Sequence, residues 1–269
     1  MTLINLHNHS SYSDGTLKPA ELAAEAARAG ISYFSLTDHD AVGGWPEMEP
    51  ALKERGIKYC YGVEIGAAEH EYMHILGYGI APADPGLNKM LADIRQAKVD
   101  RVKKAVGFLS RMGVDVTFEE LPWRGGCPPS FYQLGAVMRD KGFASSRGQA
   151  DKLYLAPGRP AYAERPDLPA AAVIKAIRAA GGKAVLAHPY SVGGRLDLES
   201  LKDAGLEGLE VYYPAHDEAA VRKYLEMAAH YGLFITAGFD FHGPGTERDK
   251  MSGYDYSPDT FKTISELFV

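Results

Sequence analysis

Short apolar runs of strand character alternate with helical segments along most of this 269-residue chain. The runs occupy residues 3–6, 31–36, 59–63, 73–78, 184–187, 209–212 and 234–239. Helical patterns occupy 16–30, with Thr16 as the expected N-cap, and 47–55, 87–112, 169–180, 218–231 and 258–267. Strands alternating with helices of this length are typical of parallel βα units. The sequence therefore predicts an α/β fold, a distorted TIM-like (β/α)7 barrel.

Between residues 113 and 165 this alternation stops. The stretch contains two short helical patterns and two turn-forming segments, Gly125-Gly126-Cys127-Pro128-Pro129 and Pro157-Gly158-Arg159-Pro160. Such Gly and Pro clusters separate short elements and do not continue a strand. We therefore expect a small helical subdomain at 113–165, inserted into a barrel formed by residues 1–112 and 166–269.

Charge and cysteine content limit the partners and the compartment. The net charge is -6 without a basic stripe, which disfavours binding along a long nucleic acid. An acidic protein can still act on phosphate esters where metal ions supply positive charge. Two cysteines are too few for a disulfide framework, and no apolar run reaches the ~20 residues of a membrane span. We expect a cytoplasmic protein that does not bind membranes.

Side chains able to bind metals recur where the predicted strands end. Five histidines and two carboxylates lie at or directly after strand C-termini: His7, His9, His39, Glu64, His188, Asp240 and His242. A further histidine, His74, lies within its strand. These ends converge on one face of a barrel, where active sites form. Each residue alone could be an ordinary hydrogen-bonding group in a loop or cap. Together, ionised carboxylates at one barrel mouth would repel each other without a cation.

The spacing of His7-Asn8-His9 indicates a metal site. Residues two apart in an extended segment face the same side, so both imidazoles can bind one ion. Asp14 adds a carboxylate just beyond them. Imidazole and carboxylate ligands without thiolate suit Zn, Mn or Fe.

These segments resemble the motifs of the PHP (polymerase and histidinol phosphatase) phosphoesterases, relatives of the amidohydrolases. The matching segments occur in order along nearly the whole chain: His7-Asn8-His9 with Ser13-Asp14-Gly15, Thr37-Asp38-His39-Asp40, Gly62-Val63-Glu64, His74, Ala187-His188-Pro189 and Gly238-Phe239-Asp240-Phe241-His242. The resemblance implies phosphate-ester hydrolysis at a centre of two to three divalent ions, Mn, Zn or Fe.

The resemblance also implies how the ligands are shared. One ion would be held by His7, His9, Glu64 and Asp240. Glu64 would bridge to a second ion, completed by His74 and His188, and a third would be held by Asp14, His39 and His242. Ions about 3.5–4 Å apart can share a bridging hydroxide, which makes Glu64 and Asp240 catalytic as well as metal-binding.

One family feature is missing from the insertion. Related sequences carry an Arg-Xaa-His pair that helps to bind substrate phosphate, but the matching stretch here reads Ser130-Phe131-Tyr132-Gln133. The candidate replacements are Arg147, Lys152 and Arg159. His216, after the strand at 209–212, is the candidate to contact phosphate or to protonate the leaving oxygen. A helix N-cap is the alternative role for His216.

We therefore predict a hydrolase of phosphate monoesters or diesters on a small phosphorylated sugar or nucleotide. The missing pair favours a cyclic phosphate of phosphorylated ribose, or another sugar phosphate, over a nucleoside 3',5'-bisphosphate. A 5'-to-3' exoribonuclease is a further alternative, and amide hydrolysis fits less well. An alternative of another class is a non-catalytic metal-binding accessory domain, against which the complete ligand set argues.

Overall fold

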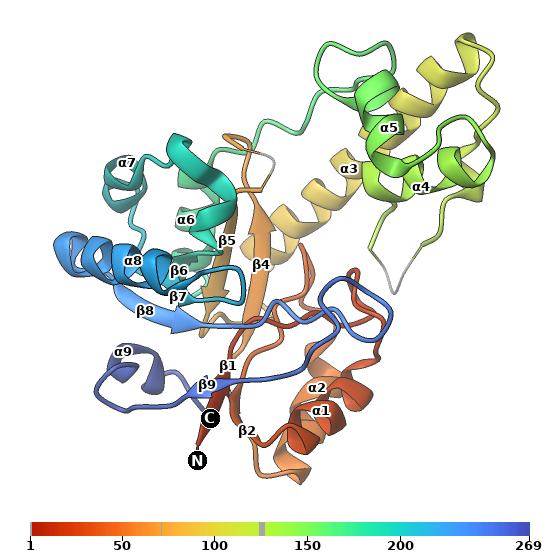
Figure 1. Ribbon diagram of the computed structural model, residues 1–269. Coiled ribbons are helices and arrows are strands. Elements are labelled where there is room, and N and C mark those ends of the chain that lie inside the picture. The colour runs from red at the N-terminus through yellow and green to blue at the C-terminus, as the bar shows by residue number, and fades with distance from the viewer. Residues whose placement is uncertain (1, 71, 124–126) are drawn as a thin grey trace. The chain divides into compact units, whose positions relative to one another are not determined.

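The computed structural model describes residues 2–70, 72–123 and 127–269. The chain divides into two compact units, one formed by Met1–Met90 with Leu168–Val269 and the other by Leu91–Asp167. Helix α3 (Pro85–Arg111) begins in the first unit and continues into the second (Figure 1). The second unit thus starts within α3 and not at residue 113, because α3 supplies Val102, Ala105 and Leu109 to that unit's own apolar core.

The first unit is a mixed α/β fold built on two sheets. One sheet has the order β3-β2-β1-β9, formed by Lys58–Tyr59, Ile31–Phe34, Leu3–Asn5 and Tyr254–Asp255. The other has the order β4-β5-β6-β7-β8, formed by Gly62–Gly66, His74–Tyr78, Lys183–Leu186, Gly208–Tyr212 and Phe234–Ala237. Isolated parallel bridges pair Asn8 with Phe241 and His39 with Glu64, so segments that follow β1 and β2 connect the first sheet to the second.

The α/β class is confirmed, but the described strands do not form the predicted closed parallel barrel. Strand β5 pairs antiparallel with both β4 and β6, and β9 pairs antiparallel with β1. The single strand predicted at 59–63 is wrong, because the chain leaves one sheet after Tyr59 and enters the other at Gly62. The amide of Cys60, between them, donates to the carbonyl of Phe34 in β2 at 3.2 Å, so Cys60 is still bonded to the first sheet.

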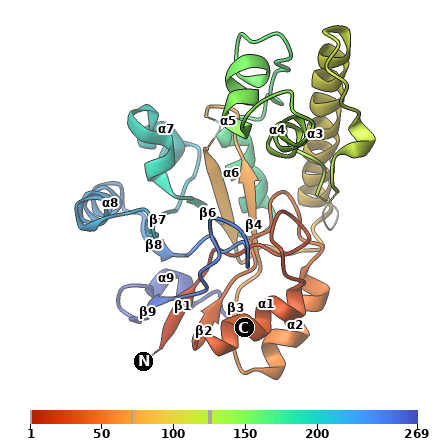
Figure 2. The ribbon, with the colours of Figure 1, turned by 45° about the vertical axis from the view of Figure 1, so that its right-hand side comes forward.

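Helices α1 (Pro19–Arg28) and α2 (Trp45–Glu54) lie side by side next to β2 (Figures 1 and 2). The predicted N-cap of α1 is wrong. The helix begins after Lys18, whose amide donates to Glu21 Oε2 at 2.9 Å. Thr16 Oγ1 instead donates to the carbonyl of His242 at 3.3 Å, which ties the loop before α1 to the last histidine motif.

The remaining helices of the first unit are α6 (Ala170–Ala179), α7 (Leu198–Asp203), α8 (Glu218–Tyr231) and α9 (Lys262–Ser265), with a 3-10 segment at Pro189–Arg195. The side chain of Asp217 caps α8 by accepting from the amide of Ala220 at 2.8 Å. His216 is therefore not the N-cap, so that alternative role is wrong. The helix ends at Gly232, whose φ of 60° favours glycine.

The described residues of the second unit form helices, helical turns and loops. Beyond α3 it contains α4 (Phe131–Asp140), α5 (Arg147–Ala150), a π-helical turn at Asp151–Leu155 and a 3-10 turn at Phe118–Glu120. Its core is closed by side chains such as Leu134, Met138 and Leu155. The predicted turn at residues 125–129 lies partly outside the described residues. Among the described helices, none is long and apolar enough to cross a bilayer.

Candidate metal centre

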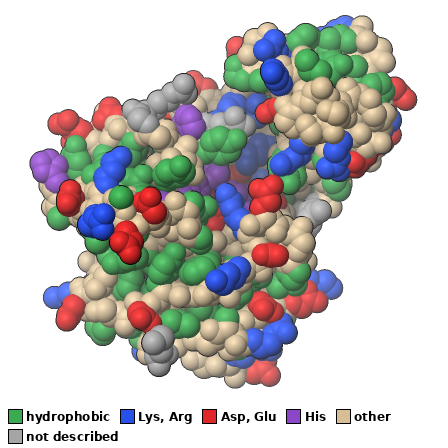
Figure 3. Space-filling model, viewed as in Figure 1, with side chains coloured by type: hydrophobic (Ala, Val, Ile, Leu, Met, Phe, Trp, Pro, Cys, Tyr) green, Lys and Arg blue, Asp and Glu red, His purple; other side chains and the backbone are tan. Residues whose placement is uncertain are grey.

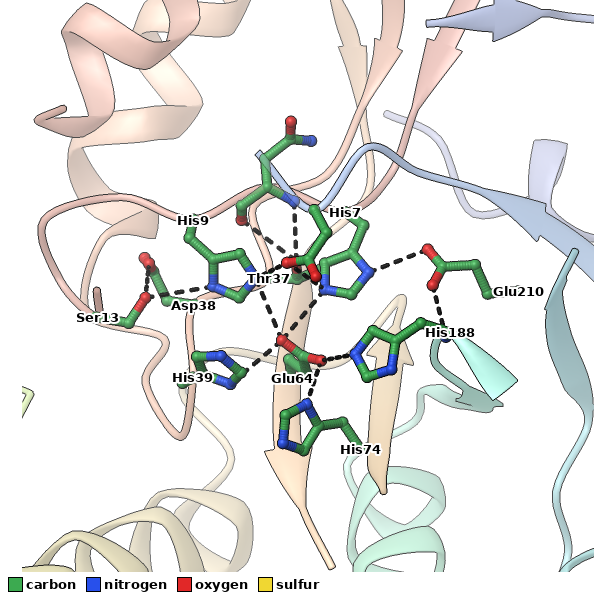
Figure 4. A network of polar contacts seen from close by, with 12 residues as sticks. His7, His9, Ser13, Thr37, Asp38, His39, Glu64, His74, His188 and Glu210 are labelled. Atoms are coloured by element: carbon green, nitrogen blue, oxygen red, sulfur yellow. Dashed lines mark hydrogen bonds and ion pairs between the residues drawn. The ribbon is translucent and has the colours of Figure 1, made fainter. Parts of the chain in front are cut away.

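The carboxylate of Glu64 lies at the centre of a cluster of histidines (Figure 4). Glu64 is fully buried and lies in the middle of β4, not at its end as predicted. Its Oε2 lies 3.1–3.2 Å from nitrogens of His7, His9 and His39. Its Oε1 lies 2.8 Å from His74 Nδ1 and 3.1 Å from His188 Nε2. The two oxygens of one carboxylate therefore face two different sets of imidazoles.

Asp240 completes an inner group of four ligand atoms. Its Oδ1 lies 3.0 Å from His9 Nε2 and 3.4 Å from His7 Nε2. Both histidines also face Glu64 Oε2, so nitrogens and oxygens of His7, His9, Glu64 and Asp240 lie within 4.8 Å of one another. This is the set expected for the first ion. The two imidazoles of His-Xaa-His do face the same side, as the spacing predicted.

An outer group gathers around Asp14. His242 Nε2 lies 3.2 Å from Asp14 Oδ1, and His39 Nε2 lies 3.9 Å from Asp14 Oδ2. His9 joins these three in one group of potential ligands. Asp14 is 39% exposed, whereas the Glu64 and Asp240 side chains are 0% and 1% exposed. The cluster is therefore more accessible to solvent at Asp14 than at Glu64 or Asp240; Figure 3 shows that some histidine side chains reach the surface of the molecule.

The antiparallel direction of β5 explains the position of His74. The sequence placed this residue within a strand, away from the converging strand ends. Because β5 runs antiparallel to β4, its first residue, His74, pairs with Gly66 at the last position of β4. The imidazole thereby reaches Glu64 from the same end of the sheet, and His39, Glu64 and His74 form a third group of potential ligands.

The inner group has the properties of a cation site. His7 Nε2, His9 Nε2, Glu64 Oε2 and Asp240 Oδ1 are buried and have no hydrogen-bond partner among the described residues. Buried polar atoms are almost always hydrogen-bonded, so four unpartnered atoms that converge need another partner. Ligand atoms in a tetrahedron with bonds of about 2.0–2.1 Å lie roughly 3.3–3.4 Å apart. The separations of 3.0–3.4 Å between these atoms are close to that value.

The carboxylates of the cluster attract positive charge to the histidines. Burial by itself lowers the pKa of His9, but contacts with Asp240 and Glu64 outweigh this effect and raise the pKa to about 10. Burial likewise would raise the pKa of Asp240, yet His7 and His9 hold it well below its usual range. For His39, burial dominates and lowers the pKa to about 3. A divalent ion can take the place of the proton that His9 would otherwise hold.

Two buried carboxylates to which the sequence assigned no role, Glu210 and Asp38, hold the histidines in position. Glu210 Oε1 lies 3.0 Å from His7 Nδ1, and Glu210 Oε2 accepts from the amide of His188 at 2.7 Å. Since the carboxylate can only accept, Nδ1 of His7 carries the proton and Nε2 is left for the cluster. Asp38 accepts from Ser13 Oγ at 2.6 Å, and Ser13 Oγ lies 3.4 Å from His9 Nδ1. Such partners orient metal-binding imidazoles and fix their tautomers.

The backbone around the cluster is held in uncommon conformations. His188 has a φ of 26° and Asp240 a φ of 51°, in the region that side chains rarely adopt. Such residues cost of order 1–3 kcal/mol each and concentrate at functional sites. A Cβ at Gly238 would lie 2.3 Å from the Cβ of His7 and 2.8 Å from Glu210 Oε1. The glycine of this motif is thus needed to let His7 and Glu210 meet.

His216 belongs to the first unit and is linked to the cluster through Tyr213, whose ring centre lies 5.2 Å from that of His216 and 5.6 Å from that of His188. Its Nδ1 lies 2.8 Å from the carbonyl oxygen of Val211, which can only accept, so Nδ1 donates. Its Nε2 is buried and has no hydrogen-bond partner in the described part of the chain. The three cations predicted to bind substrate, Arg147, Lys152 and Arg159, all belong to the second unit.

Comparison with known proteins identifies relatives that match almost the whole chain. A 3',5'-nucleoside bisphosphate phosphatase of Chromobacterium violaceum is 33% identical over 91% of this chain and 89% of its own length. A 5'-3' exoribonuclease of Haemophilus influenzae is 33% identical over 89% and 90%. A phosphoribosyl 1,2-cyclic phosphate 1,2-diphosphodiesterase of Eggerthella lenta is 28% identical over 89% and 94%.

Solved structures show the same fold. An amidohydrolase from Chromobacterium violaceum with bound sulfate and no metal matches with a TM-score of 0.80 and 29% identity, covering 98% of this chain and 96% of the other. A protein of Bifidobacterium adolescentis assigned as a metal-dependent phosphoesterase matches with a TM-score of 0.77 and 27% identity, covering 98% and 94%. The sequence profile of the PHP domain matches residues 5–243. The chain therefore belongs to the PHP domain family, as its motifs predicted.

Proposed function

We propose that this protein is a metal-dependent phosphoesterase that hydrolyses phosphate monoester or diester bonds of a small phosphorylated sugar or nucleotide. Its cluster would hold two to three divalent ions, Mn, Zn or Fe, with the ligand sets expected from the sequence. The proposal includes a cytoplasmic location, with which the two free cysteines agree.

The observation that carries this proposal is the division of the Glu64 carboxylate between two sets of histidines. Its Oε2 faces His7, His9 and His39, and its Oε1 faces His74 and His188. A carboxylate shared in this way suits a bridge between two ions. Bound divalent ions supply Lewis-acid activation of water and neutralise the charge of a phosphoryl group.

The protein's own groups would complete the reaction around the ions. Glu64 and Asp240 would bind the ions, and Glu210 would keep His7 and His188 in place during turnover, because it contacts His7 Nδ1 and the amide of His188. We assign His216 to the substrate, since its buried Nε2 has no hydrogen-bond partner among the described residues and His216 is not among the predicted metal ligands. A proton taken up at this nitrogen could pass to the leaving oxygen.

A cation beside α4 supports phosphate binding by the second unit. Tyr132 lies in the first turn of α4, in the stretch where relatives carry the Arg-Xaa-His pair. The guanidinium carbon of Arg147 lies 3.5 Å from the centre of the Tyr132 ring. A positive charge is thereby held at the start of this helix, so Arg147 is the strongest of the three candidate replacements.

Three related classes of substrate are considered: nucleoside bisphosphates, short RNA ends, and cyclic or other sugar phosphates. A nucleoside bisphosphate phosphatase and an exoribonuclease that match almost the whole chain are each 33% identical to it, and a cyclic phosphodiesterase is 28% identical. The missing Arg-Xaa-His pair favours a cyclic ribose phosphate or another sugar phosphate as substrate. The cation at α4, Arg147, favours a substrate that carries a second phosphate group. We propose a small phosphorylated sugar or nucleotide, including a cyclic phosphate, as substrate. The alternatives are a nucleoside 3',5'-bisphosphate and the 5' end of a short RNA.

A phosphate-release screen would test this proposal. Purified protein supplemented with Mn should release phosphate, or open a cyclic phosphate, from at least one member of a panel of nucleotides, cyclic phosphates, sugar phosphates and short 5'-phosphorylated RNA. The non-catalytic alternative predicts metal binding without turnover on every compound. The ranking of substrates would decide between the three classes.

Alanine at Arg147, Lys152 and Arg159 together should lower kcat/KM on the best substrate by about 10- to 100-fold, the range for one charge-assisted contact. The loss should appear mainly in KM, because the ligands of the metal centre belong to the first unit. A matched triple variant with alanine at Lys103, Lys104 and Arg111, exposed cations of α3, removes the same charge and should change kcat/KM little. Unchanged kcat/KM in the first variant would show that the second unit does not bind the phosphate.

A further inference from the structure

A cation that the family motifs do not include touches the inner group of ligands. Arg248 lies in the loop that follows His242, and its Nη1 is 2.7 Å from Asp240 Oδ2. Its side chain is 46% exposed, whereas that of Asp240 is 1% exposed. The guanidinium therefore reaches from solvent to a buried residue of the cluster.

The two oxygens of Asp240 have different surroundings. Oδ1 faces the imidazoles of His7 and His9. Oδ2 contacts Arg248 and also accepts from the hydroxyl of Tyr213 at 3.1 Å. Only the width of one carboxylate separates the guanidinium from the inner ligand atoms.

The backbone of Arg248 is tied to the cluster. Its carbonyl accepts from the amide of His242 at 2.9 Å, and its amide donates to Thr246 Oγ1 at 3.2 Å. The loop is therefore anchored at a residue of the outer group, and the side chain starts from a fixed point. An arginine on a mobile surface loop would lack this anchor.

The hydrogen bond to Asp240 does not by itself explain why residue 248 is positively charged. A cation on a ligand carboxylate draws electron density away from the oxygen that binds metal, and Tyr213 already satisfies Oδ2 with a neutral donor. A guanidinium has five N–H donors in a planar fork that matches phosphate oxygens. With one edge on Asp240 and about half the side chain exposed, donors remain for an oxyanion.

We propose that Arg248 binds a non-bridging oxygen of the substrate phosphoryl group at the metal centre. This inference rests on the proposed phosphoesterase function, and it adds a cation of the first unit to the phosphate-binding residues. It does not depend on Arg147, Lys152 or Arg159.

The test compares Arg248→Ala with wild type, both loaded with Mn, using inorganic phosphate as the probe in calorimetry. Phosphate should bind about 10- to 100-fold more weakly to the variant, the usual effect of losing one charge-assisted hydrogen bond. Metal content should stay the same. Arg248→Lys should recover part of the affinity, and added guanidinium should partly restore hydrolysis of 4-nitrophenyl phosphate by Arg248→Ala.

Two control variants separate phosphate binding from other roles of Arg248. Tyr213→Phe removes the other donor to Asp240 Oδ2, and should change phosphate affinity less than about 3-fold. Lys250→Ala removes an exposed cation of the same loop and should have no effect. The inference is overturned if Arg248→Ala binds phosphate like wild type, if it loses metal, or if Tyr213→Phe weakens phosphate equally. Failure of metal-loaded wild type to bind phosphate at all would overturn the phosphoesterase proposal as well.

Discussion

Glu64→Gln should lose turnover by more than about 10³-fold, beyond the 10²–10³-fold typical of removing one electrostatic stabiliser. The amide removes the charge that faces five imidazoles, and it can offer only one acceptor oxygen where the carboxylate offers two. Metal content should therefore fall by more than one ion per chain. Elemental analysis of protein purified without chelator, together with steady-state kinetics, measures both effects.

Asp14→Asn is the matched control for this variant. It makes the same chemical change at a carboxylate that is 39% exposed and faces only the outer group. We expect a smaller loss of metal, confined to the third ion, and circular dichroism should show that both variants are folded. Equal metal loss in the two variants would mean that Glu64 does not bridge two ions.

Chelation should abolish activity and lower the thermal stability of the protein. Each ion present at 1,000 times its Kd stabilises the folded state by about 4 kcal/mol. For a chain of this size, 1 kcal/mol corresponds to roughly 2–4 °C in Tm. Removal of two ions should therefore lower Tm by more than about 10 °C, because buried carboxylates such as Glu64 and Asp240 lose their cation. Elemental analysis before chelation should find two to three ions per chain.

Adding back one metal at a time provides the control for chelation. Mn, Zn or Fe should restore both Tm and activity, whereas Ca should restore little, because imidazole is a poor ligand for it. A metal content below one ion per chain after Mn or Zn supplementation would contradict the multi-ion centre. So would a Tm that does not change on chelation.

The order and spacing of the histidine and carboxylate motifs predicted most of the side chains that meet at the cluster. All nine predicted ligands lie in or beside the three overlapping groups, because most of them sit at strand ends that converge in any βα arrangement. The His-Xaa-His pair also faces one side, since alternation along an extended chain is a local property. Their roles as ligands stay a prediction until metal is measured.

The sequence was less informative about how the strands are assembled. It did not show that β5 reverses direction, or that the run at 59–63 is shared between two sheets. Strand character in a short apolar run is nearly the same for parallel and antiparallel neighbours. The direction of a strand depends on its pairing partners, which are distant in sequence.

Only the tertiary structure revealed the residues that support the cluster. Glu210 lies 203 positions from His7, and Asp38 lies 25 positions from Ser13. Arg248 follows its motif in a loop whose sequence has no distinctive spacing. The sequence around a carboxylate that is buried and accepts from an imidazole does not distinguish it from a carboxylate at the surface. The folding of the whole chain, and not any local pattern, buries Glu210 and Asp38 and brings Arg248 into contact with Asp240.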